Sequence, residues 1–387
     1  MLPAVDVRRR PPAEIDGTLL WSALILLLLG TVMVYSASIA IAEASRYAGN
    51  YSGYFLVRHG VYAAIGLIFG LLAFQVPVQD WQKMSPWLFA AGLILLVLVL
   101  IPGVGRWVNG ARRWLSLGVA NVQPSELMKL FAVLYAADYT VRKMPDMRSP
   151  RKAFMPLAAA MMAVGALLLA EPDLGAFVVI VSIAFGIFFL GGMRLRLFAI
   201  LAALLAVAFA LVVVIEPYRI KRIQGFMDPW SNPFDKCCYQ LTHSLMAFGR
   251  GELFGVGLGA SVEKLFYLPE AHTDFLLAVI GEELGFAGVV SVIVLFCLLV
   301  QRAFAIGQQC VALDRLYPSL VAQGVGIWLG VQSIINMGSN MGLLPPKGLT
   351  LPLMGFGGSG LLANCLALAI LLRIDWENRQ LMRGAKL

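Results

Sequence analysis

Residues 268–285 read LPEAHTDFLLAVIGEELG. The run after Asp274 is apolar and long enough for a membrane-spanning helix, yet Glu282 and Glu283 lie inside it. Ionisable side chains within a bilayer are costly, and they usually face a cavity or a partner. We interpret the three acids as the border of a reaction site at the outer end of this helix.

The composition of the chain is that of a polytopic membrane protein. Of its 387 residues, 60% are apolar and 13% are charged, and the mean hydropathy is +0.81. A soluble domain of this size could not bury so many apolar side chains in one core. The net charge is +8, but the basic residues cluster in short segments between apolar runs, as a topology signal would. This distribution argues against nucleic acid as a partner.

Ten apolar runs of spanning length define the predicted architecture, which is all-α. They fall roughly at 17–42, 58–76, 83–101, 123–141, 154–171, 173–190, 194–216, 272–302, 313–340 and 350–373. The prediction is a ten-helix membrane domain over residues 17–373, with tails at 1–16 and 374–387. A large outside loop, at about 217–271, separates spans seven and eight and includes a short amphipathic piece around 240–248.

The distribution of basic residues predicts the orientation. With both tails in the cytoplasm, the inside segments carry 17 Lys and Arg, Arg373 included, and the short outside loops carry six. Cytoplasmic loops of membrane proteins are enriched in these residues. The chain is therefore predicted to be a multi-pass protein of the cytoplasmic (inner) membrane with both termini in the cytoplasm.

The fourth predicted span begins with QPSELMKL, which places Glu126 and Lys129 on one helix face, near enough to pair. A helix start alone explains the acid, because Pro124 suits the first turn and a carboxylate there faces the positive end of the helix dipole. It does not explain a lysine one turn deeper, where lipid penalises a charge. We therefore interpret the pair as part of a site.

Spacing places the acids of the eighth span on different helix faces. Eight residues separate Asp274 from Glu282, about 12 Å along a helix, and Glu283 points almost opposite Asp274. The alternative is that Asp274 caps the helix and that GEELG (281–285) makes an interhelical polar contact between glycines that allow close packing. Together with the fourth span and Arg113 in the segment GARRW, the acids instead suggest one polar pocket that opens outward.

Two further residues are candidates for this pocket. Lys347 lies in LLPPKGLTLP, beside the glycine-rich stretch GFGGSG, and could attract a pyrophosphate. A surface lysine whose head reaches water is its ordinary alternative. His272 is one of only three histidines and precedes Asp274 closely, with an interfacial side chain as the alternative interpretation.

Six motifs occur in this order: QPSELMKL, EPYRIKRIQGFMDPW, YQLTHSLMAFGRGELFGVGLG, KLFYLPEAHTDF, GEELG and LLPPKGLTLPL. In this order over ten spans, the chain resembles the SEDS family of cell-wall polymerases, and the division branch of that family more than the elongation branch. The resemblance runs from the first span to LLRIDWE, residues 371–377. It implies a peptidoglycan glycosyltransferase that polymerises lipid II into β-1,4 glycan strands outside the membrane during septal wall synthesis.

The resemblance also implies roles and partners. The essential acid of the family falls on Asp274, the acid–base pair of the pocket on Glu126 and Lys129, and the loop arginine before Trp on Arg113. The implied partners are a class B penicillin-binding protein (an FtsI-like transpeptidase) and other membrane proteins of the divisome at the septum. The chain departs from the family where it reads LTHS for LTQS and GASVEK for GNSVQK, but these departures do not touch Asp274.

The expected chemistry needs a base for the acceptor hydroxyl, here Asp274, and cations for the departing pyrophosphate, here Lys129, Arg113 and Lys347. A divalent cation, Mg or Mn, could be held by Asp274 or by the pyrophosphate, although no ligand cluster in the sequence demands one. Two alternatives are a flippase that moves lipid II across the bilayer and a scaffold that activates the penicillin-binding protein. Charges in the outer half of the spans favour surface chemistry over transport.

Overall fold

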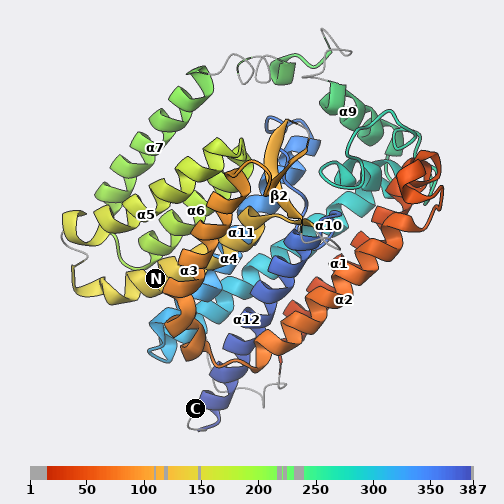
Figure 1. Ribbon diagram of the computed structural model, residues 1–387. Coiled ribbons are helices and arrows are strands. Elements are labelled where there is room, and N and C mark those ends of the chain that lie inside the picture. Colours follow the sequence, from red (N-terminus) through yellow and green to blue (C-terminus); the bar gives the residue numbers. More distant parts are fainter. Residues whose placement is uncertain are drawn as a thin grey trace.

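The computed structural model describes residues 15–108, 110–116, 121–146, 150–215, 220, 225–230 and 239–384. These residues are mostly helical, and most helices run together in one bundle (Figure 1). The helices are α1 (Gly17–Ala44), α2 (Tyr54–Gln75), α3 (Val78–Leu100), α4 (Pro124–Arg142), α5 (Pro150–Ala170), α6 (Leu174–Leu190), α7 (Leu195–Ile215), α9 (Tyr239–Gly251), α10 (Leu276–Ala312), α11 (Leu316–Asn340) and α12 (Gly358–Met382). Most of the predicted N-terminal tail and part of the predicted outside loop lie outside the described residues.

Each predicted span coincides with one of these helices, and α9 coincides with the amphipathic piece expected in the long loop. Within the described ranges, six helices are long and apolar enough to cross a membrane: α1, α2, α3, α10, α11 and α12. Apolar stretches in α5, α6 and α7 are shorter. The polytopic helical character is thus confirmed, whereas the number of ten crossings stays a prediction.

The all-α prediction missed a small antiparallel sheet at one end of the bundle, near the label β2 in Figure 1. Its strands are β1 (Gly105–Val108), β2 (Ala111–Ser116) and β3 (Asn121–Val122), in that order. Strands β1 and β2 pair so that Val108 lies opposite Ala111, with Asn-Gly between them in the sequence. An Asn-Gly pair between two strands is a strong hairpin signal. The sequence analysis assigned only the apolar runs on both sides of this segment and predicted no strands there.

Helix α4 lies at the centre of the bundle, where it packs against α3, α6, α11 and α12. Most of its side chains are buried, including Glu126, Lys129 and Asp138. These ionisable groups therefore face other helices and not lipid, which is how a helix with several charges can be accommodated within a membrane protein.

The other end of the bundle is held by ion pairs. Helix α12 continues to Met382, past the predicted end of the tenth span, and there Arg379 Nε donates to Asp375 Oδ2 at 2.6 Å. Asp16, the N-cap of α1, accepts hydrogen bonds from Arg302 of α10, and its own backbone N–H donates to Asp375. The charges that the sequence suggested for a tail thus join α1, α10 and α12.

Candidate active site

Asp274 lies in the loop before α10. The sequence had instead predicted it inside the eighth span, at the beginning of the helix. The helix begins at Leu276, and its N-cap is Phe275, so the interpretation of Asp274 as a cap is also wrong. Asn336 and Asn340 of α11 donate from Nδ2 to the Asp274 carbonyl oxygen at 2.8 and 2.9 Å, which fixes this backbone outside the helix. The half-buried Asp274 carboxylate has no hydrogen-bond partner among the described residues.

The electrostatic surroundings of Asp274 favour its protonated form. Burial raises the pKa of Asp274 to about 7, and the negative charge of Glu270 adds to the rise. Asp173 and Glu126 act in the same direction, whereas the Arg113 guanidinium lowers this pKa. A carboxylate whose pKa lies near neutrality is a far better general base than an ordinary aspartate. These charged groups gather at one place, as the sequence predicted for Asp274, Glu126 and Arg113.

A second segment approaches the Asp274 carboxylate from the loop between α11 and α12. A Cβ atom added to Gly348 would lie 3.3 Å from Asp274 Oδ2, so this stretch of backbone contacts the acid directly. Lys347 is the preceding residue and is partly buried. The structure therefore brings the predicted lysine into the neighbourhood of Asp274 through the main chain of this loop.

Glu126 and Lys129 form the ion pair that their spacing predicted. Lys129 Nζ donates to Glu126 Oε1 at 2.7 Å and to Gln332 Oε1 at 2.9 Å, and the lysine is fully buried. Gln332 Nε2 in turn donates to the Thr350 carbonyl oxygen at 2.9 Å, in the same loop as Lys347. The second carboxylate oxygen, Glu126 Oε2, is buried and has no hydrogen-bond partner within the described ranges. The pair is thus part of a polar chain from α4 through α11 to the loop beside Asp274.

Arg113 reaches the site from strand β2. Its Nε donates to the Glu171 carbonyl oxygen at 3.1 Å, and a terminal nitrogen donates to the Pro172 carbonyl oxygen. Asp173, the N-cap of α6, accepts from the Ser125 hydroxyl at 2.9 Å and so ties this turn to the beginning of α4. The small sheet, which the sequence analysis did not predict, therefore positions Arg113, which the sequence analysis did select.

Sequence reasoning did not select Glu171 and Asp173, although both stand in EPDLG, residues 171–175, where the fifth predicted span ends and the sixth begins. Two acids within three residues between apolar runs were the available signal. Glu270 and Asn336 were missed as well. The turn at residues 270–274 brings Glu270 to Asp274, and Asn336 reaches Asp274 from α11, which is distant in the sequence.

His272 packs within an aromatic cluster. Its ring centroid lies 4.8 Å from that of Phe55 and 5.6 Å from that of Phe356, and its backbone carbonyl accepts from the Phe356 N–H at 3.0 Å. Burial lowers the pKa of His272 and favours the neutral ring, while the charge of Glu270 acts in the opposite direction. The ring contacts α2 and the loop before α12, which fits the alternative of a packed side chain better than a charged ligand for substrate.

Glu282 belongs to a different network. Its buried carboxylate accepts from Arg250 of α9 at 2.7 Å, from the Ser261 hydroxyl, and from the Val262 N–H at 2.9 Å. The Glu282 side chain thus extends from α10 to the loop that joins α9 to α10, and its carboxylate oxygens are already occupied there.

Glu283 points to the other side of α10. It accepts from the Ser36 hydroxyl of α1 at 2.8 Å and from Lys264 Nζ at 2.6 Å. A Cβ on Gly251 would lie 1.8 Å from the Gly281 carbonyl oxygen, so glycines allow α9 and α10 to approach closely. The interhelical interpretation of GEELG is therefore the one that the structure supports.

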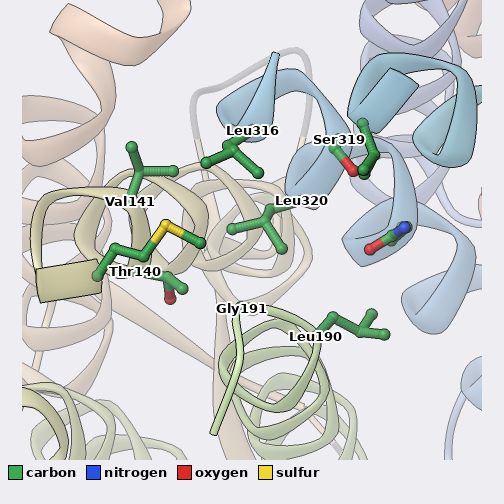
Figure 2. Close-up of a pocket in the computed structure, with 10 residues that line it drawn as sticks. Thr140, Val141, Leu190, Gly191, Leu316, Ser319 and Leu320 are labelled. Carbon is green, nitrogen blue, oxygen red and sulfur yellow. The ribbon is translucent and has the colours of Figure 1, made fainter. Parts of the chain in front are cut away.

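Neither grouped metal ligands nor a cavity indicates a second candidate site among the described residues. Within the described residues, no three His, Cys, Asp or Glu side chains are grouped as ligands of a metal ion. A cavity of about 100 Å³ lies at the far end of α10, between the ends of α4 and α6 and the beginning of α11 (Figure 2). Its lining is mainly apolar and contains no titratable side chain, with Thr140, Ser319 and Gln323 as the polar members. We therefore locate the candidate site at Asp274.

Comparison with known proteins identifies the family. Residues 17–380 match the FtsW/RodA/SpoVE family, which is described as a family of cell cycle proteins. The chain belongs to this family. It is 65% identical over 384 residues to a probable peptidoglycan glycosyltransferase FtsW of Aromatoleum aromaticum, covering 98% of this chain and 93% of that protein. A protein of the same name from Burkholderia thailandensis is 57% identical over 374 residues, with 96% and 81% covered.

Two solved structures share the fold of this family member. A chain from a study of how a peptidoglycan synthase complex coordinates polymerization and crosslinking is 29% identical, with a TM-score of 0.74 over 94% of this chain and 98% of that one. The rod shape determining protein RodA of Thermus thermophilus is 30% identical, with a TM-score of 0.68 over 93% and 96%. The SEDS resemblance predicted from the sequence motifs, and its division branch, are thereby confirmed.

Proposed function

We infer that this protein is a peptidoglycan glycosyltransferase that joins lipid II units into β-1,4 glycan strands. Two relatives that match this chain over most of their length are named as probable peptidoglycan glycosyltransferases. The observation that carries the inference is Asp274, whose backbone is fixed by two asparagines while its carboxylate stays available beside a buried acid–lysine pair.

Asp274 acts as the general base in this proposal. It takes the proton of the acceptor 4-hydroxyl as that oxygen forms a bond to C1 of the donor sugar and the C1–pyrophosphate bond breaks. Its raised pKa suits this task, because the carboxylate can hold the proton that it receives. Arg113, Lys129 and Lys347 supply positive charge for the departing pyrophosphate.

The proposed arrangement in the membrane follows from the charge distribution. Ten helices cross the cytoplasmic membrane, both termini lie in the cytoplasm, and the end that carries Asp274 and the small sheet faces outward, at the division septum. The 17 basic residues of the inside segments, against six in the short outside loops, support this orientation.

The proposed partner is a class B penicillin-binding protein, an FtsI-like transpeptidase, within the divisome. A similar chain comes from a complex that coordinates polymerization with crosslinking, which supports such a pairing. The enzyme and scaffold functions can coexist, because a surface that binds a transpeptidase need not include Asp274.

Transport of lipid II is the competing function. A flippase needs polar groups along a path to both membrane faces. In the described residues, the charges of the candidate site gather around Asp274, whereas the opposite end is held by the ion pairs of Asp16, Arg302 and Asp375. This asymmetry favours chemistry at one surface.

The test is polymerisation of labelled lipid II by the purified chain with and without its transpeptidase. Glycan product that a muramidase digests is expected from the wild type and not from Asp274→Ala, while both bind the transpeptidase equally. Translocation of lipid II in vesicles without any glycan product would support the flippase and overturn the proposal.

A further inference from the structure

Glu171 is a buried carboxyl group that the reaction outlined above does not use. Helix α5 ends at Ala170, so Glu171 lies in the turn that leads to α6. Its side chain is fully buried, and neither carboxyl oxygen has a hydrogen-bond partner in the part of the chain that the structure describes. Burying an ionised carboxylate without partners is very costly, so a group in this situation needs a particular explanation.

Arg113, the cation that acts on this carboxyl, does not pair with it. Arg113 donates to the backbone carbonyl oxygens of Glu171 and Pro172, and not to the Glu171 side chain. An ionised carboxylate beside a guanidinium normally accepts charge-assisted hydrogen bonds from it. The geometry is therefore that of a neutral carboxylic acid next to an arginine whose charge is not compensated by it.

The neighbouring groups explain this state. Asp173 follows two residues later, and its carboxylate is occupied by Ser125, Gln123 and the Ala176 N–H. Burial and this second acid raise the pKa of Glu171 to about 8, while Arg113 opposes the rise. Among the described residues, Asp173 and Arg113 are the charged groups that act on Glu171. The residues at the beginning of α4 that bond to Asp173, the N-cap Gln123 and Ser125, are neutral.

We propose that Glu171 is a positioning residue that works as a neutral acid, fixing Arg113 through its backbone while leaving the arginine charge for the anionic pyrophosphate of the substrate. This inference rests on the proposed glycosyltransferase function. Ionised Glu171 would pair with Arg113 and add a negative charge close to Asp173, so that the pyrophosphate would bind more weakly. The neutral form thus sets the affinity for the anionic part of lipid II.

Glu171→Gln tests the idea because glutamine matches the neutral acid in shape. At pH 7 its kcat/KM for lipid II should lie within about threefold of the wild type. Between pH 8 and pH 9 the wild-type value should fall about fivefold, mainly through KM, as the acid ionises. Glu171→Gln should lack this alkaline loss, whereas Glu43→Gln, the same change at an exposed residue of α1, should retain it.

A spectroscopic measurement separates this inference from the proposed function. The infrared band of protonated carboxylic acids in the wild type should contain a component that disappears with a midpoint near pH 8, and this component should be absent from Glu171→Gln. A folded Glu171→Gln enzyme with more than tenfold lower activity at pH 7, or an alkaline loss shared by both enzymes, would overturn the inference. If no variant polymerised lipid II, the function would fail, but the band would still decide the state of Glu171.

Discussion

Lowering the pH from 8 to 6 should slow polymerisation about tenfold in Glu171→Gln, because the base must be ionised to accept a proton. In the wild type Glu171 becomes neutral over the same range, and this reduces the loss to about fivefold. Burial and the charge of Glu270 raise the pKa of Asp274 to about 7, so about nine-tenths of the carboxyl groups are ionised at pH 8 and about one-tenth at pH 6. An aspartate with an ordinary pKa would be ionised throughout this range and would give no such loss.

Glu270→Gln makes the same prediction specific to Asp274. Glu270 is exposed, so water screens its charge, and its removal should lower the pKa of Asp274 by about half a unit. The acid limb should move to lower pH by that amount, and the rate at pH 6 should rise about two- to threefold. Glu43→Gln, on an exposed position of α1, serves as the control and should leave the limb in place.

The assay is the initial rate of glycan formation from labelled lipid II at low concentration, with the transpeptidase partner present and its own active site blocked. Low substrate makes the profile report kcat/KM and therefore the ionisation of the free enzyme. A rate that stays constant from pH 6 to pH 8, or a limb that moves to higher pH in Glu270→Gln, would refute the account of Asp274.

Three further predictions concern the surroundings of the base. Lys129→Met should lower stability by about 3–5 kcal/mol, since it leaves a buried carboxylate without its cation; Lys83→Met, at an exposed pair, should change stability by less than about 1 kcal/mol in thermal unfolding. Gly348→Val should reduce polymerisation at least about tenfold with an unchanged melting temperature, because the new side chain would occupy the space beside the Asp274 carboxylate, the proposed base. Lys264→Met should destabilise the loop before α10, seen as faster hydrogen exchange there, because Glu283 would lose its buried partner; unchanged exchange would contradict this role.

The sequence predicted most helices because apolar runs of spanning length are a strong and local signal. It also predicted the pair of Glu126 and Lys129, since residues three apart on a helix face meet whatever surrounds them. Arg113 and Asp274 could be selected by chemistry and resemblance, but their approach depends on a hairpin and a loop that the apolar pattern did not reveal.

The rest depends on contacts between distant segments. Glu282 was grouped with Asp274 because the two lie close together in the sequence, within one predicted span. In the structure, its hydrogen-bond partners come from α9 and from the loop at Ser261. The environment of Glu171 depends on strand β2 and on the turn before α6, and spacing within one element gives no information about such contacts. Burial without a partner is a property of the folded chain alone.

The most direct test of the central claim is a comparison of wild type with Asp274→Asn, which keeps the shape of the side chain and removes the base. Binding of lipid II and the polymerisation rate are measured on the same purified complex. The account predicts binding within about threefold of the wild type and a rate at least about a thousandfold lower. A variant that polymerised lipid II at more than about a tenth of the wild-type rate would contradict a catalytic function for this carboxylate.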